Sequence, residues 1–170
     1  QILILYILAL KLGSIKKDIK IKNYQEKIKD LKKLPNLIKK SLLLDNDIQS
    51  ISSTFNDAKG SMFLGRGFSY PIALEGALKL KELSCVHAEG YPAGEMKHGP
   101  LALIEQGLPV VILAPKDRYF EKTISNMQEV IARGGMVILI TNEDHKIISE
   151  NVRFTLKVPS SDYTLAPFLM

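Results

Sequence analysis

The sequence predicts an α/β protein: a five-stranded parallel sheet in a three-layer αβα sandwich, preceded by helices. Two uncharged apolar runs, PVVILA at 109–114 and MVILIT at 136–141, are typical of strands buried on both faces. Helical patterns alternate with such runs, which implies right-handed crossovers and a sheet covered on both faces. The chain has 170 residues, 46% of them hydrophobic and 24% charged, which is enough for one domain with its own core.

The first third of the chain is predicted to be helical, with no clear strand. The expected elements are an apolar helix over 1–12 that ends near Gly13, an amphipathic helix over 23–44 that is kinked or broken at Pro35, and a helix over 46–56 capped by Asp45. The opening run QILILYILAL is too short to span a bilayer, so we expect a buried helix rather than a membrane or signal segment. Because this run starts without a helix cap, we expect the chain to be cut from a longer protein.

From Gly60 onward, strands and helices are expected to alternate. The predicted strands are 61–65, a weak one at 85–88, 109–114, 136–141 and an edge-like one at 153–158, and the predicted helices are 70–83 and 118–133. In such sheets ligands bind outside the carboxyl ends of the strands, where the strand order reverses. The segment Gly65–Ser69 directly follows the first strand, so we expect it on the ligand side.

The net charge of +5 is unevenly distributed along the chain. Residues 11–40 hold eleven lysines against three acidic residues, a local balance of +8, and contain no arginine and one aromatic residue, Tyr24. The lysines alternate with apolar residues at helical spacing, so we interpret them as a solvated helix face and expect no nucleic-acid or membrane partner. The single cysteine, Cys85, excludes an internal disulfide, and its apolar neighbours predict a buried thiol. Nothing indicates an oxidising compartment, so a cytoplasmic setting is the default.

A glycine turn, Gly65-Arg66-Gly67, joins the first predicted strand to its helix. Glycines allow a sharp turn that leaves backbone amides free to face an anion, and Ser69 adds a hydroxyl. A purely structural turn explains the same residues equally well. The turn lacks the third glycine of the dinucleotide fingerprint and the GK[ST] of a phosphate loop, so we expect no nucleotide cofactor.

Three charged residues, Glu75, Lys79 and Glu82, share one face of the following helix at spacings of four and three. One interpretation is a surface ion pair between Glu75 and Lys79. The other is catalytic: Glu82 lies at the helix end, where a carboxylate can move a proton between adjacent carbons of a sugar. The spacing alone does not decide between them.

His98 lies in a loop, between Lys97 and the pair Gly99-Pro100, close to Glu95. An imidazole with a pKa near neutrality can open a sugar ring by moving protons between the ring oxygen and O1. Neither of the other two histidines is spaced with His98 like a metal pair, so we expect no metal.

The runs GRGFSYPIALEGALKLKELS and HAEGYPAGEMKHGPLALI closely resemble the isomerase half of the glutamine–fructose-6-phosphate aminotransferase (isomerising) family, the glucosamine-6-phosphate synthases. Weaker similarity extends over nearly the whole chain. The family has a glutaminase domain followed by two tandem sugar-isomerase (SIS) domains with a flavodoxin-like fold. It converts fructose 6-phosphate and glutamine-derived ammonia to glucosamine 6-phosphate without a cofactor.

The resemblance implies roles for three residues. Glu82 matches the family's catalytic glutamate, which transfers the proton between C1 and C2. His98 matches the histidine of the KHGP motif, which assists ring opening and reaches the site of the neighbouring subunit. Lys79 matches a lysine that lies near the sugar and supports proton movement. The implied partners are a sugar phosphate, the glutaminase domain and a second copy of the chain.

The resemblance also implies what the chain lacks. Residues 1–44 match the closing helix of the first SIS domain and a connecting helix, and residues 45–170 most of the second. The family's phosphate cradle lies upstream of Gln1 and its Schiff-base lysine beyond Met170, so we expect the chain alone to be inactive. Two alternatives remain: a SIS-fold phosphosugar deglycase or isomerase, and a non-catalytic phosphosugar-sensing module.

Overall fold

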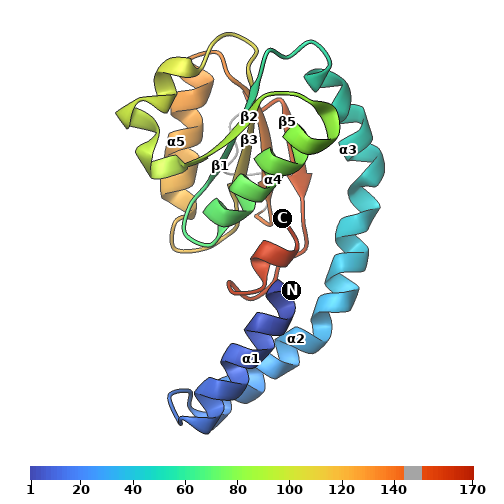
Figure 1. The fold of residues 1–170 in the computed structure, drawn as a ribbon, viewed down its shortest axis with the longest axis vertical. Helices are drawn as coiled ribbons and strands as arrows, with labels where there is room; N and C mark the ends of the chain where they lie inside the picture. The colour runs from blue at the N-terminus through green and yellow to red at the C-terminus, as the bar shows by residue number, and fades with distance from the viewer. Residues whose placement is uncertain (144–150) are drawn as a thin grey trace.

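The computed structural model describes residues 1–143 and 151–170, which form a five-stranded parallel sheet with helices on both faces (Figure 1). The strand order is β2-β1-β3-β4-β5, and every neighbouring pair is parallel. The strands are β1 (Ser61–Gly65), β2 (Ala88–Pro92), β3 (Pro109–Ala114), β4 (Met136–Thr141) and β5 (Phe154–Lys157). The predicted parallel five-stranded α/β fold is confirmed.

Alternating residues of the central strands face two different helical layers. Val110 and Ile112 of β3 pack in a cluster with α5 (Phe120–Ala132) and the 3₁₀ helix η3 (Ala93–His98). Val111, between them, packs in a second cluster with α3 (Asp45–Ser52) and α4 (Ser69–Ser84). A further 3₁₀ helix, η4 (Pro100–Leu103), leads from η3 towards β3. Burial on both faces explains the uncharged runs of β3 and β4.

The N-terminal helices form a hairpin that extends from the sheet in Figure 1. They are α1 (Ile2–Ile15) and α2 (Ile21–Ser41), and α2 leads through η1 (Leu42–Leu44) into α3, which is followed by η2 (Ser53–Phe55). α1 continues past Gly13, and α2 continues through Pro35. Proline has no backbone N–H to donate within the helix. The helix continues through Pro35 because the apolar packing of Leu34 and its neighbours against the C-terminal segment compensates for that missing hydrogen bond. Asp45 begins α3 but makes no side-chain cap bond.

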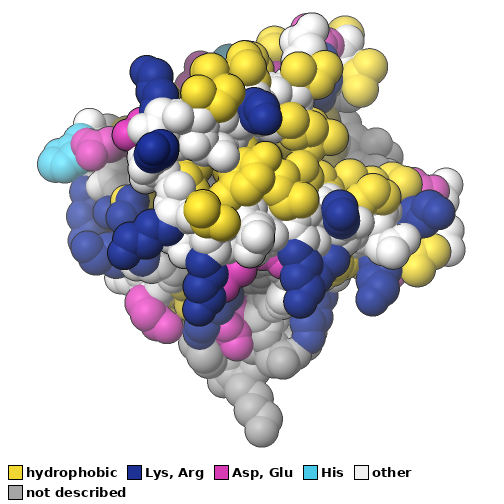
Figure 2. Space-filling view, turned by 90° about the horizontal axis from the view of Figure 1, so that it is seen from below, with side chains coloured by type: hydrophobic (Ala, Val, Ile, Leu, Met, Phe, Trp, Pro, Cys, Tyr) yellow, Lys and Arg dark blue, Asp and Glu magenta, His cyan; other side chains and the backbone are white. Residues whose placement is uncertain are grey.

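The first helix is largely exposed, contrary to the buried helix that we expected. Only Leu10 of α1 is buried, and the exposed large apolar residues of α1 are Ile2, Leu3, Ile4, Leu5, Ile7, Leu8, Leu12 and Ile15. Figure 2 shows hydrophobic side chains gathered on the lower end of the molecule, with lysines and arginines around them. α1 makes few contacts with α2, and an apolar helix is buried only where a neighbour covers it. In residues 1–143 and 151–170, no helix combines the length and apolar character needed to cross a membrane.

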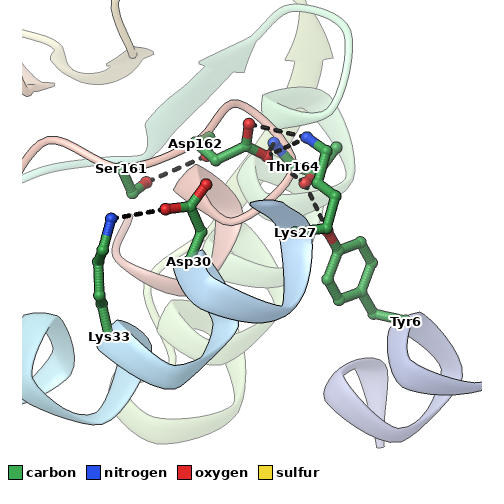
Figure 3. A network of polar contacts seen from close by, with 7 residues as sticks. All are labelled: Tyr6, Lys27, Asp30, Lys33, Ser161, Asp162 and Thr164. Atoms are coloured by element: carbon green, nitrogen blue, oxygen red, sulfur yellow. Dashed lines mark hydrogen bonds and ion pairs between the residues drawn. The ribbon is translucent and has the colours of Figure 1, made fainter. Parts of the chain in front are cut away.

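A polar network fixes the hairpin to the C-terminal loop (Figure 3). Lys27 of α2 donates to both carboxylate oxygens of Asp162, at 2.7 and 2.8 Å. The hydroxyl of Thr164 also bonds Asp162, and Tyr6 of α1 lies 2.9 Å from that hydroxyl. Burial alone would raise the pKa of Asp162, but the hydrogen bonds from Lys27 and Thr164 outweigh it and lower that pKa below its ordinary value. The network therefore joins both helices to the domain.

Two local predictions between α4 and β2 are wrong. The second strand is Ala88–Pro92 rather than 85–88, and Cys85 is exposed rather than buried. Cys85 caps the C-terminus of α4 in a left-handed conformation, with φ of 59°. A residue in that position turns the chain away from the helix, so the strand starts later and the thiol faces solvent.

Candidate active site

α4, which carries Lys79 and Glu82, packs closely on the sheet. A Cβ on Gly65 would collide with the carbonyl oxygen of Ser69, and one on Gly90 of β2 would lie 2.9 Å from the Cα of Leu74. Ala73 and Ala77 face the sheet and are buried. The small residues therefore let the helix backbone approach β1 and β2, which fixes the direction of the helix.

Lys79 and Glu82 form an ion pair on the exposed face of the last turns of α4. Lys79 Nζ lies 2.8 Å from Glu82 Oε2 and 3.7 Å from Glu75 Oε1. The hydrogen bond and charge of Glu82, followed by the charge of Glu75, raise the pKa of Lys79 above its ordinary value. Lys79 is therefore a stable cation, and it offsets the unfavourable placement of a carboxylate at a helix C-terminus. Both side chains are about half exposed, so they are open to a ligand.

The turn that carries Glu82 is closed by its own C-terminal residues. The hydroxyl of Ser84 donates to the carbonyl of Leu80 at 2.6 Å, and the amide of Cys85 donates to the carbonyl of Lys81 at 3.2 Å. These bonds satisfy carbonyls that a helix end otherwise leaves without a partner. The local sequence thus holds Glu82 on a regular turn up to the end of the helix.

His98 is the last residue of η3, which follows β2 directly. Its side chain is 75% exposed, and its Nε2 lies 3.9 Å from Glu95 Oε2. Gly99 follows with φ of 142°, a conformation that favours glycine. The imidazole therefore projects from the molecule, with a carboxylate beside it and its ring open to a ligand.

The structure separates the two predicted proton-transfer groups. Gly65 ends β1 at the carboxyl edge of the sheet, and α4 runs back from there to the amino edge, where β2 begins. Glu82 lies thirteen residues after Ser69 in α4, which is about 20 Å along the helix at about 1.5 Å per residue. His98 follows the carboxyl end of β2, so it lies on the same edge as Gly65. Glu82 and His98 of one chain are therefore at opposite edges of the sheet, and the turn at 65–69 is near His98 rather than Glu82.

The glycine turn is packed against aromatic residues of its own chain. Gly67 has φ of 56°, and a Cβ there would lie 2.6 Å from the ring of Tyr119 and 3.1 Å from the hydroxyl of Tyr163. Phe68 stacks on Tyr163 with ring centroids 4.9 Å apart. Ser69 is buried in the first turn of α4. Steric reasons thus account for the glycines at 65 and 67, and substrate binding by Gly65, Gly67 and Ser69 stays a prediction.

A cavity of about 340 Å³ lies behind Lys79, between α3, α4 and the sheet. Its lining is almost entirely apolar and includes Ile51, Leu80, Val111 and Ile138. Such a lining offers few hydrogen-bond partners for a sugar hydroxyl or a phosphate, so the cavity does not suit a polar ligand. Among the described residues, no group of three or more His, Cys, Asp or Glu side chains is arranged to hold a metal ion.

Contacts around His98 that sequence reasoning missed involve α5. Arg66 Nη1 donates to Asn126 Oδ1 at 3.0 Å, and Lys97 Nζ lies 3.0 Å from Glu129 Oε1. Asn126 and Glu129 lie three positions apart in the α5 sequence, which puts them on one face of that helix. That spacing was a visible signal, but nothing in the sequence indicated that this face meets the loop of His98.

Comparisons with known proteins identify the family. A model of the SIS domain matches residues 54–170. Glutamine–fructose-6-phosphate aminotransferase (isomerizing) of Bartonella henselae is 50% identical over 84% of this chain and 24% of its own length. The enzyme of the same name from Agrobacterium fabrum is 44% identical over 99% of this chain and 28% of its own length.

A solved structure agrees with these relatives. The C-terminal domain of glucosamine-fructose-6-phosphate aminotransferase from Francisella tularensis is 41% identical, with a TM-score of 0.92 over 97% of this chain and 46% of that one. The chain spans about a quarter of the length of the curated relatives named above. The matched residues, the sheet order and the solved structure lead to one conclusion: the chain belongs to the SIS domain family.

Proposed function

We propose that this chain is the second SIS domain, with the end of the first, of a glutamine–fructose-6-phosphate aminotransferase (isomerising). The intact protein would convert fructose 6-phosphate and glutamine-derived ammonia to glucosamine 6-phosphate in the cytoplasm. The observation that carries the proposal is the Lys79–Glu82 pair, 2.8 Å apart and half exposed at the end of α4. Relatives of that name at 44–50% identity support it.

Glu82 acts as the base and acid of the isomerisation in this proposal. Its carboxylate takes the proton from one of the two carbons C1 and C2 and returns it to the other, which interconverts the ketose and the aldose. Lys79 keeps a positive charge beside that carboxylate and stabilises the oxyanion that develops on the sugar oxygen. Both groups lie on a helix, and a rigid element holds a proton-transfer group in place better than a loop does.

His98 opens the sugar ring, and it serves the site of a second chain. Glu82 and His98 of one chain lie at opposite edges of the sheet, and α4 runs about 20 Å from the edge of His98 to Glu82, which is longer than a hexose phosphate. If both act on one sugar, two chains must supply them. A two-fold dimer, in which each chain gives His98 to its partner's site, meets this requirement.

The exposed apolar surface of α1 supports the proposed domain boundaries. Residues 1–44 would comprise the closing helix of the first SIS domain and a connecting helix, and residues 45–170 the second SIS domain. Contiguous exposed apolar surface on a helix marks an interaction site, and Ile2, Ile4 and Leu5 are each at least 60% exposed. The upstream domain of the same chain would cover them.

The intact protein with Glu82→Gln tests the proposal. The substitution keeps the size and one hydrogen-bond acceptor but removes the base, so we expect fructose 6-phosphate to bind normally and isomerisation to fall by roughly 10² to 10⁴-fold. Exchange of the transferred carbon-bound proton with solvent is the direct measurement. Glu121→Gln, at an exposed glutamate on α5, is the matched control and should exchange at the parent rate. Exchange at the parent rate in Glu82→Gln would reject the role of Glu82 as the proton-transfer group.

A further inference from the structure

We infer that Arg66 and Glu129 are positioning residues: they hold η3, the 3₁₀ helix that ends at His98, from two sides. The inference rests on the proposed function, because it assigns these residues to the group that opens the sugar ring. η3 itself has few means of keeping its shape: it is a six-residue 3₁₀ helix with no side-chain cap bond. The contacts with Arg66 and α5 therefore stabilise the conformation of η3.

The first contact comes from the glycine turn. The Arg66 guanidinium lies against η3 so closely that a Cβ on Gly94 would be 2.9 Å from Nη2 and 3.1 Å from Cζ. Nη1 of the same group donates to Asn126 Oδ1 at 3.0 Å, and Asn126 is only 8% exposed. The guanidinium is therefore anchored on α5 and lies against the first turn of η3. An arginine suits this place because its planar group can lie flat on a backbone while it donates at its edge.

The second contact joins the other end of η3 to the same helix. Lys97, next to His98, pairs with Glu129 Oε1 at 3.0 Å. The Glu129 side chain is 24% exposed, and its other oxygen, Oε2, is buried without a hydrogen-bond partner among the described residues. Lys97 is thus the cation that offsets the burial of this carboxylate. Breaking the pair leaves Glu129 without that compensation, so the contact keeps Lys97 near α5.

Together the two contacts define where the imidazole points. Ala93 and Met96 of η3 are buried in the core, so the polar contacts at Gly94 and Lys97 leave only the outer side of the turn free. Glu95 and His98 occupy that side, 67% and 75% exposed. A ring-opening group must meet the sugar oxygens within hydrogen-bond distance, and an error of about 1 Å in such a placement can cost on the order of 10²-fold in rate.

The decisive experiment compares a cyclic with an open-chain substrate in the intact protein. Fructose 6-phosphate must be opened, whereas 5-deoxyfructose 6-phosphate lacks the hydroxyl that closes the ring. We expect Gly94→Ala and Glu129→Gln each to lower kcat/KM for the cyclic sugar by about tenfold and to leave the open-chain sugar nearly unchanged. Gly94→Ala is informative because the three atoms nearest to its Cβ all belong to the flexible end of Arg66, so we expect the guanidinium to move and the fold to be retained.

A charge-swapped double variant, two control variants and amide hydrogen exchange distinguish a positioning role from a general loss of stability. Lys97→Glu combined with Glu129→Lys recreates the pair and should recover much of what each single change loses. Glu121→Gln and Lys122→Met, at exposed positions on α5, are matched controls that should leave the ratio of the two substrates unchanged. Amide hydrogen exchange over residues 93–98 should speed up in Gly94→Ala and Glu129→Gln, and remain at the parent rate in the controls.

His98→Ala, measured alongside, distinguishes this inference from the proposed function. If His98→Ala is defective only on the cyclic sugar and the Gly94 and Glu129 variants share that selectivity, the inference holds. If His98→Ala is selective but those variants slow both sugars equally, or neither, the positioning role is rejected alone. If His98→Ala itself slows both sugars equally, its ring-opening role is rejected, and the positioning role with it.

Discussion

Replacing Asp162 by asparagine should loosen the attachment of the α1–α2 hairpin to the domain. Asp162 accepts bonds from Lys27 at 2.7 and 2.8 Å and from the amide of Thr164 at 3.0 Å. It also bonds the hydroxyl of Thr164, which connects on to Tyr6 of α1. The amide side chain of the Asp162→Asn variant would retain one carbonyl oxygen for Thr164 but would lose the charge that holds Lys27.

The size of the effect follows from the exposure of the pair. A hydrogen bond to a charged group contributes about 1.5–3 kcal/mol, and the contribution falls when solvent screens the charges. The side chains of Lys27 and Asp162 are 32% and 24% exposed, so we expect a loss of about 1–2 kcal/mol. That corresponds to a local opening that is about 5- to 30-fold more frequent.

Amide hydrogen exchange of the intact protein measures this opening directly. The amides of Thr164, Leu165 and Ala166 should exchange about 5- to 30-fold faster in Asp162→Asn, because they lie in the loop that Lys27 no longer holds. Thr164 bonds the side chain of Asp162, and Leu165 and Ala166 bond its backbone carbonyl. Asp30→Asn is the matched control: Asp30 pairs with Lys33 at the same 2.7 Å, but within one helix, where such pairs contribute only a few tenths of a kcal/mol. Equal effects of the two substitutions would refute the reasoning.

The pH dependence gives a second check on the same pair. The pKa of Asp162 in the folded protein is below its ordinary value of 3.8, so the unfolded state binds the proton more readily. The stabilisation that Asp162 contributes to the folded protein is therefore fully present above pH 3.8, and it is lost as the pH falls through the lower pKa of Asp162 in the folded state. The difference between the parent and Asp162→Asn should stay constant from pH 7 to about pH 5 and vanish in stronger acid. A difference that shrinks already between about pH 7 and pH 5 would contradict this assignment.

Two further predictions concern α4 and the turn before it. Lys79→Met should lower kcat by about tenfold or more with little change in KM, because it removes the cation 2.8 Å from Glu82. Steady-state kinetics test this expectation, with Lys79→Arg as the control that retains the charge. Gly67→Ala should lower the melting temperature, because alanine costs about 1 kcal/mol at φ of 56° and its Cβ would meet the Tyr119 ring at 2.6 Å. An unchanged melting temperature would show that the ring moves away at no cost.

The fold could be predicted where one kind of residue dominates a segment. PVVILA and MVILIT are short, uncharged and rich in β-branched residues, which favours buried strands over helices, and they are β3 and β4 with the predicted bounds. β2 could not be placed from its residues, AEGYP, because a glycine and a proline weaken the strand pattern. Its true start depends on the left-handed turn at Cys85, a position where glycine is the usual signal.

Errors elsewhere have a common cause in contacts between distant segments. Pro35 predicted a kink or a break in α2, and the break is absent: α2 continues because Leu34 packs against Val158, Leu165 and Leu169, which are far away in the sequence. The same holds for the site. The spacing on α4 predicted an ion pair of Glu75 with Lys79, which forms at 3.7 Å beside a closer pair of Lys79 with Glu82 at 2.8 Å. The separation of Glu82 from His98 instead depends on the path of α4 across the sheet. A linear pattern contains the first kind of information and not the second.

Mixed dimers of two inactive variants give the most direct test of the central claim, that Glu82 and His98 reach one sugar from different chains. Glu82→Gln and His98→Ala proteins are each assayed alone, then mixed under conditions that exchange subunits. In a two-fold dimer, about half of the randomly mixed pairs would hold one intact site, so activity should recover to about a quarter of the parent value. Activity that stays at the level of the separate variants, with subunit exchange verified, would contradict the shared site.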